Sequence, residues 1–100
     1  MQTVLEENKN VIIQLCEKHH VKKLYAFGSV LTDQFRKDSD VDMIVDFEKV
    51  DLKSYADNYY DLKFSLEDLL KRQIDLLEEQ AILNPYFRNN IEKQKQLIYG

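Results

Sequence analysis

The stretch FGSVLTDQFRKDSDVDMIVDF, residues 27–47, joins a glycine–serine pair to an Asp-x-Asp that opens an apolar run. Gly28 and Ser29 close one short apolar segment, and Asp40 comes after ten intervening residues, with Asp42 two positions further on. The alternation in VDMIVDF is typical of a strand. Carboxylates at the head of a buried strand are costly unless something binds them, so this stretch predicts a functional site as well as two strands.

The rest of the chain predicts helices around these strands. Periodicity and turn residues predict helices over 3–20, 54–70 and 84–100, a helical turn over 30–35, and strands over 21–28, 41–47 and 72–79. Expected helix caps are Ser54 or Asp51 for the second long helix, and Asn84 and Gly100 for the two ends of the last. The order predicts an α/β (α+β) fold, with a small mixed sheet of three or more strands covered by helices. Residues 1–100 are expected to form a single domain.

Composition narrows the classes of function. With 100 residues and 44% hydrophobic side chains, the chain can bury one small core. A net charge of −4 argues against direct nucleic-acid binding, which requires a basic face. Cys16 is the single cysteine, which excludes a disulfide framework and favours a reducing compartment. No signal peptide or membrane-length apolar run is visible, so we expect a cytoplasmic protein without a membrane partner.

The acidic residues predict a site for a hard divalent cation. Asp40 and Asp42 are spaced i, i+2, so on a strand they project from the same face. A third acid, Asp75, interrupts the apolar strand QIDLLEE. If that strand lies beside residues 41–47, the three acids converge, and carboxylate oxygens are the ligands that Mg²⁺ prefers. Three acids and two metal ions are what an in-line attack on phosphorus requires.

The glycine–serine pair predicts a place for phosphate groups. Gly28 allows the backbone to approach a phosphate closely. Ser29 offers a hydroxyl and begins a short turn whose free N–H groups favour anions. Arg36 and Lys37 are the cations that follow in the loop. Together with the acids, these residues predict a site for a nucleoside triphosphate such as ATP.

The spacing of GS, ten residues and then DVD resembles the signature of the DNA polymerase beta nucleotidyltransferase superfamily. The strands SDVDMIV and IDLL and the closing segment NPYFRNNIEKQKQLIYG resemble its smallest members, the minimal nucleotidyltransferases that act as antitoxins of HEPN-domain ribonuclease toxins. The resemblance covers essentially the whole chain. It implies that Gly28 and Ser29 bind the triphosphate, and that Asp40, Asp42 and Asp75 hold two magnesium ions and catalyse transfer.

The implied activity is transfer of AMP from ATP to a tyrosine of the toxin in a toxin–antitoxin complex, with release of diphosphate. The sequence departs from the family pattern at Val30, where a basic residue is usual, and at Asp33, which lies in a region that usually has a glycine. Two alternatives therefore stand beside protein adenylylation: an antitoxin that acts by binding alone, and nucleotidyl transfer to a small molecule. Tyr60 and Phe64 are candidates for a protein interface if they face solvent.

Overall fold

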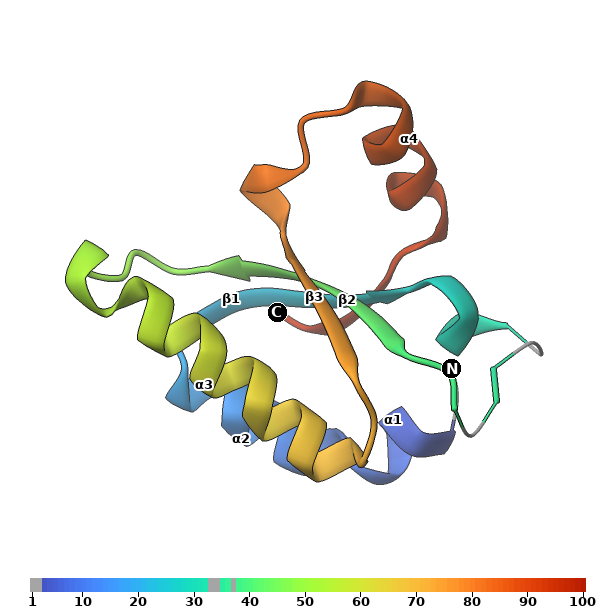
Figure 1. Ribbon diagram of the computed structural model, residues 1–100, viewed down its shortest axis with the longest axis horizontal. Helices are drawn as coiled ribbons and strands as arrows, with labels where there is room; N and C mark the ends of the chain where they lie inside the picture. Colours follow the sequence, from blue (N-terminus) through green and yellow to red (C-terminus); the bar gives the residue numbers. More distant parts are fainter. Residues whose placement is uncertain (1–2, 33–34, 37) are drawn as a thin grey trace.

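The computed structural model describes residues 3–32, 35–36 and 38–100, so Asp33 and Lys37 lie outside the described residues. Strands and helices alternate along most of the chain, and the helices lie on both sides of a central sheet (Figure 1). The elements are α1 Thr3–Glu7, α2 Lys9–Lys18, β1 Val21–Phe27, η1 Gly28–Leu31, β2 Val41–Phe47, α3 Leu52–Leu70, β3 Ile74–Glu78, η2 Glu79–Ala81, α4 Pro85–Gln94 and β4 Gln96–Tyr99.

The sheet has four strands in the order β3-β2-β1-β4. Strands β1 and β2 pair antiparallel, as do β1 and β4, whereas β2 and β3 are parallel. The mixed sheet covered by helices is confirmed, as is the expected neighbourhood of the strand at 41–47 and the strand containing Asp75. The bounds of β2 are those predicted from its alternation.

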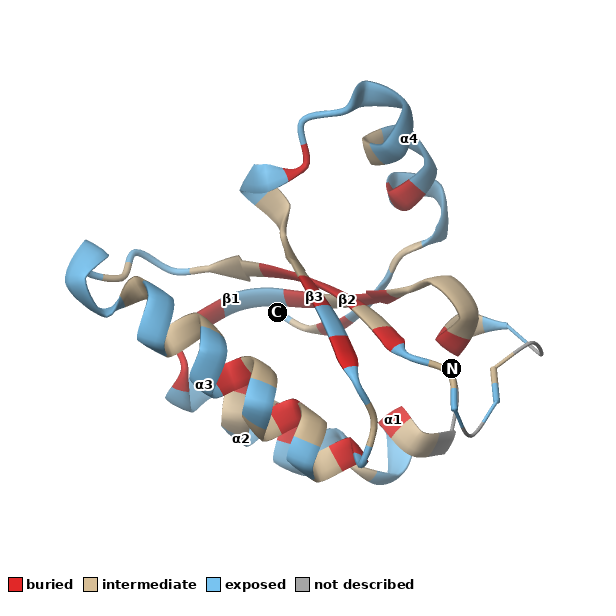
Figure 2. Ribbon diagram, viewed as in Figure 1, coloured by how far each residue is buried: buried red, intermediate tan, exposed pale blue. Residues whose placement is uncertain are grey.

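One face of the sheet carries the main core. Alternate residues of the strands, among them Val41, Met43 and Val45, pack against Leu62 and Leu66 of α3 and the apolar side of α2. Figure 2 shows the buried residues of these helices on the side that faces the sheet. Burial of this apolar surface stabilises the fold, because each large side chain removed from water contributes about 1.5–3 kcal/mol.

The opposite face carries a smaller cluster under α4. Ile44 of β2 contacts Ile82 and Ile91, and Tyr25 and Leu77 pack against the same group. Strand β2 is thus buried on both faces along part of its length. The α4 face is less completely covered than the other, which leaves room there for a site.

The first predicted helix is divided in two. Asn8 separates α1 from α2, and its side-chain Nδ2 donates to the carbonyl oxygen of Val4 at 2.7 Å. An asparagine side chain competes in this way for backbone groups, which favours a break over a continuous helix. The expectation of one helix over 3–20 was therefore wrong at this residue.

The last predicted helix was too long. Asn84 begins α4 as expected, with its Oδ1 accepting from the backbone N–H of Tyr86 at 2.9 Å. The helix ends at Gln94, and Gln96–Tyr99 forms β4 on the edge of β1. Gly100 consequently follows a strand and does not cap a helix. The pairing partner on β1 overrides the weak helical pattern of this segment, as is common for strands.

Side chains of α3 occupy the free edge of β3. The carboxylate Oε2 of Glu67 accepts from the backbone N–H of Ile74 at 3.0 Å, and the hydroxyl of Tyr59 donates to the carbonyl oxygen of Leu76 at 2.5 Å. These bonds satisfy backbone groups that an edge strand otherwise leaves unpaired. Asp51 caps α3, as predicted, by accepting from the backbone N–H of Lys53 at 3.4 Å. Within the described residues, none of the helices has the length and apolarity needed to cross a membrane.

Candidate active site

Asp42 lies between Phe27 and Asp75 in one row across three strands. Phe27 of β1 is its antiparallel Cα partner, and Asp75 of β3 is its parallel partner. Residues directly opposite each other on neighbouring strands project to the same face. Since Ile44 shares that face with Asp42, the row lies on the face that α4 partly covers. The next row along the strands is Tyr25, Ile44 and Leu77.

Gly28 brings the backbone of the glycine–serine pair against the first of these acids. Its φ is +76°, a conformation that favours glycine, and a Cβ built on it would lie 2.6 Å from Oδ2 of Asp42. The glycine thus allows both the turn after β1 and the close approach of the Asp42 carboxylate. The glycine–serine pair and the Asp-x-Asp, which ten residues separate in the sequence, are therefore in contact through Gly28 and Asp42.

The acids influence one another electrostatically. Burial raises the pKa of Asp42, and the charges of Asp75 and Asp40 raise it further. Asp40 and Asp75 are exposed and Asp42 is half-buried. Within the described ranges, no three acidic, histidine or cysteine side chains are gathered around one point that would hold a metal ion. The donor set nevertheless fits a divalent cation, because oxygen ligands and mutual repulsion among carboxylates both favour one.

Ser29 is the second residue of the 3₁₀ turn η1, which begins at Gly28 directly after β1. Its carbonyl oxygen accepts from the backbone N–H and from Oγ1 of Thr32, both at 2.9 Å. Val30, which stands where the family pattern described above usually has a basic residue, is buried in the main core. The structure therefore brings Gly28 against the Asp42 carboxylate, keeps Ser29 next to it in the same turn, and buries the side chain of Val30 in the core.

Arg36 lies in the loop that leads to Asp40. Its backbone N–H donates to Oγ of Ser39 at 3.0 Å, and its carbonyl oxygen accepts from the backbone N–H of Ser39 at 3.1 Å. The guanidinium of Arg72 ties this loop down: Nη1 donates to the carbonyl oxygens of Arg36 at 2.6 Å and Ser39 at 3.1 Å. The same guanidinium lies 4.1 Å from the centroid of the Phe35 ring.

Two features of the site were missed from the sequence. Arg72 contacts the loop before Asp40 from just ahead of β3, and a lone arginine before an apolar strand gives no local signal of that role. Phe87 of α4 packs edge-to-face on Phe27, with ring centroids 6.4 Å apart. Phe87 is nevertheless 42% exposed, so part of its ring remains open to solvent beside the acidic row.

A family model and two similar relatives assign this chain to the same family of proteins. The model of the family described as "Polymerase beta, Nucleotidyltransferase" matches residues 10–100. The chain is 31% identical over 99 residues to "Putative protein adenylyltransferase MJ1379" of Methanocaldococcus jannaschii, which covers 99% of this chain and 93% of the relative. It is 32% identical over 84 residues to "Protein adenylyltransferase MntA" of Thermococcus cleftensis, covering 78% of this chain and 80% of the relative.

Solved structures share the fold. A "putative minimal nucleotidyltransferase" superposes with a TM-score of 0.78 and 29% identity, covering 96% of this chain and 95% of that one. A "toxin-antitoxin with AMP-PNP" superposes with a TM-score of 0.71 at 22% identity, covering 93% of this chain and 73% of that one. A "tri-AMPylated Shewanella oneidensis HEPN toxin in complex with MNT antitoxin" gives 0.65 at 20% identity, covering 95% and 71%. The last two comparisons bear on the fold alone.

Proposed function

The chain belongs to the polymerase beta nucleotidyltransferase family, and on that premise we propose that it is an antitoxin-type protein adenylyltransferase that transfers AMP from ATP to a tyrosine of a HEPN ribonuclease toxin. The observation that carries the proposal is the row of Asp42 and Asp75 beside Gly28. In this row Asp42 and Asp75 share one face of the sheet, and Gly28 lies against the Asp42 carboxylate. The names of the relatives support a protein as the acceptor.

We assign the metal ligands to Asp40, Asp42 and Asp75. Asp40 and Asp42 would hold two magnesium ions, and Asp75 would help to hold the catalytic one. The ions, when bound, supply positive charge that neutralises the triphosphate and favours ionisation of the acceptor hydroxyl. Binding a cation also relieves the repulsion that raises the pKa of Asp42.

The transfer is an in-line displacement at the α-phosphorus of ATP. Gly28 and Ser29 bind the phosphates that leave, and Arg36 approaches them from the loop. The acceptor oxygen forms a bond to the α-phosphorus as the bond from that phosphorus to the bridging oxygen breaks, and diphosphate leaves with the electron pair. The acceptor proton passes to the carboxylate of Asp75. The product is AMP joined to the acceptor through a phosphodiester.

A toxin partner is supported by solved complexes with the same fold. On this chain, Tyr60 and Phe64 of α3 are exposed and their rings stack with centroids 5.8 Å apart. Exposed aromatic pairs of this kind are enriched at protein interfaces. They remain our predicted contact with the toxin in a hetero-oligomer.

The proposal is tested with purified protein, a HEPN-domain protein as the candidate partner, ATP and magnesium. Intact-mass spectrometry follows the partner, and we expect a gain of one or more AMP units. The Asp40→Asn/Asp42→Asn double variant should bind the partner and transfer no AMP. An unchanged partner mass with the wild-type protein, under conditions where the complex forms, contradicts enzymatic transfer.

A second candidate is an antitoxin that neutralises its partner by binding alone. The burial of Val30 favours it, because no cation reaches the phosphates from this position. The two candidates are separated by the same double variant. Full neutralisation of the toxin by Asp40→Asn/Asp42→Asn supports binding alone, whereas loss of neutralisation with a retained complex supports transfer.

A further inference from the structure

An apolar groove lies on the α4 face, beyond the acidic row. It has a volume of about 310 Å³ and lies between β3, η2 and the beginning of α4. Leu77, Ile82, Leu83 and Phe87 provide its apolar lining. Leu83 is 85% exposed, although it is a large apolar side chain, so the groove is open to a ligand from solvent. We call this feature the η2–α4 groove.

The groove begins next to the acids. Leu77 follows Asp75 by two residues on β3 and points to the same face, which places it roughly 6.6 Å further along the strand. At the other wall, Phe87 contacts Phe27, the residue that stands opposite Asp42. The groove and the acidic row are therefore adjacent parts of one surface.

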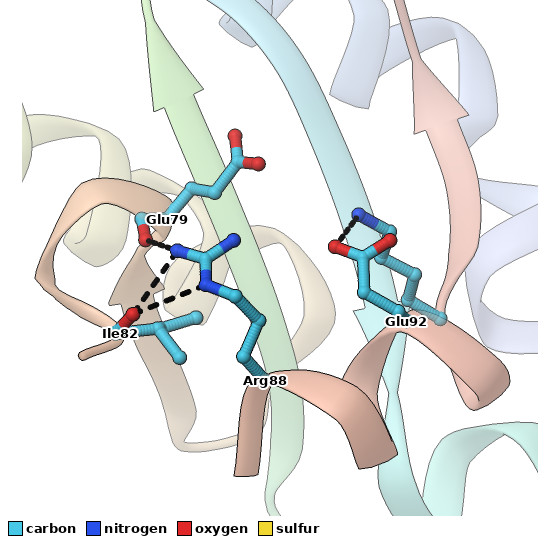
Figure 3. Close-up of polar contacts among 5 residues, drawn as sticks. Glu79, Ile82, Arg88 and Glu92 are labelled. Atoms are coloured by element: carbon cyan, nitrogen blue, oxygen red, sulfur yellow. Dashed lines mark hydrogen bonds and ion pairs between the residues drawn. The ribbon is translucent and has the colours of Figure 1, made fainter. Parts of the chain in front are cut away.

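The walls of the groove are tied together by Arg88. From α4, its Nη2 donates to the carbonyl oxygens of Glu79 at 2.9 Å and Ile82 at 3.0 Å, and Nε also donates to Ile82 at 3.2 Å. Figure 3 shows the guanidinium of Arg88 between the helix and the η2 turn. Lys95, bonded to Glu92 at 2.9 Å, anchors the end of α4 by packing its ammonium over the ring of Tyr25. The groove is thus preformed.

The direction of the proposed displacement indicates which part of the substrate would bind in the η2–α4 groove. In an in-line displacement the acceptor and the leaving group lie on opposite sides of the reacting phosphorus. Gly28 and Ser29 are on the β1 side of Asp42, and Asp75 is on the β3 side. If diphosphate leaves towards Gly28, the acceptor enters over β3, where the groove lies.

We propose that the η2–α4 groove holds the aromatic ring of the acceptor tyrosine, with its hydroxyl at Asp75 and its ring over Leu77. This inference rests on the proposed function. A tyrosine side chain measures roughly 6–7 Å from Cα to its hydroxyl oxygen, which is comparable to the spacing of roughly 6.6 Å between Asp75 and Leu77 along the strand. Serine and threonine are too short to reach the apolar lining, so the groove selects a phenol over an aliphatic hydroxyl.

The test uses the intact protein with magnesium and α,β-methylene ATP, an analogue whose bond to the leaving group is not broken. N-acetyl-tyrosine amide and N-acetyl-serine amide are titrated in turn, and amide shifts are followed by NMR. We expect the tyrosine compound to shift Leu77, Leu83 and Phe87, and the serine compound to leave them unchanged. Leu83→Ser should weaken binding of the tyrosine compound at least fivefold.

The matched control is Tyr86→Ser, because Tyr86 is 84% exposed on the same helix and does not line the groove. It should change that affinity less than twofold. Equal responses to both amides, absence of shifts at the groove, or contacts between adenine protons and Leu83 would each overturn the proposal. If the ATP analogue and the tyrosine compound both bind as expected but no AMP is transferred to a partner protein, the proposed function fails, although the groove is still a binding site for a phenol ring.

Discussion

Replacing Gly28 with alanine tests whether the glycine–serine turn and the acids form one unit. The φ of +76° costs a residue with a Cβ about 1–3 kcal/mol, of which some is offset by lower entropy of the unfolded chain. The new Cβ would lie 2.6 Å from Oδ2 of Asp42. That separation is roughly 0.5–1 Å short of ordinary contact, so the carboxylate must move by about that distance.

These magnitudes predict different effects on stability and on transfer. We expect Gly28→Ala to lower the free energy of unfolding by about 1–2 kcal/mol, measured by urea denaturation. The rate of AMP transfer should fall by about a hundredfold, because a displacement near 1 Å in a catalytic group has that order of effect. Transfer is measured by intact mass at saturating ATP, at a temperature where the variant is folded.

Gly100→Ala is the matched control. Gly100 also has a positive φ, +114°, and its Cβ would lie 2.6 Å from the carbonyl oxygen of Lys22, away from the acids. It should lose stability and keep the transfer rate of the wild type. A wild-type rate for Gly28→Ala, or equal losses of rate in both variants, would refute the link between the turn and Asp42.

Three further perturbations test the loop, a titrating group and the metal site. Arg72→Ala should lower the free energy of unfolding by about 1–2 kcal/mol and slow AMP transfer, because the loop before Asp40 loses its hydrogen bonds to the guanidinium. Urea denaturation measures the stability, and single-turnover kinetics measure the transfer rate. An unchanged transfer rate contradicts a positioning role for Arg72. Burial and Glu78 raise the pKa of Tyr55 to about 12, so between pH 10 and 12 the folded state binds more protons and loses stability as pH rises. Below pH 10, Tyr55→Phe should be less stable than the wild type by roughly 1 kcal/mol, because it lacks the hydroxyl hydrogen bond. The variant has no phenol to ionise, so this difference in the free energy of unfolding should narrow between pH 10 and 12 in urea melts. A difference that stays constant over this range contradicts the raised pKa of Tyr55. Adding 10 mM Mg²⁺ should stabilise the wild type by about 1.4 kcal/mol if the dissociation constant is near 1 mM, and should leave Asp40→Asn/Asp42→Asn unchanged in thermal melts.

The local pattern was sufficient for the elements whose own residues decide their structure. The alternation in VDMIVDF predicted β2, Asn84 marked the start of α4, and Asp51 was one of the two caps predicted for α3, which begins two residues earlier than expected. It failed for Gln96–Tyr99, which is a strand because the edge of β1 offers backbone partners. No feature of that segment alone contains this information, since strand formation depends on the neighbouring strand.

The sequence by itself predicted which residues carry the proposed chemistry: a glycine, a serine and three aspartates at spacings that fit strands. Only the tertiary structure decided that Asp42 lies between Phe27 and Asp75, and that Gly28 touches its carboxylate. The same holds for the η2–α4 groove, whose walls come from three elements, two of which Arg88 joins by hydrogen bonds. The physical reason is that side-chain identity and periodicity act over a few residues, whereas register and packing depend on segments far apart in the chain.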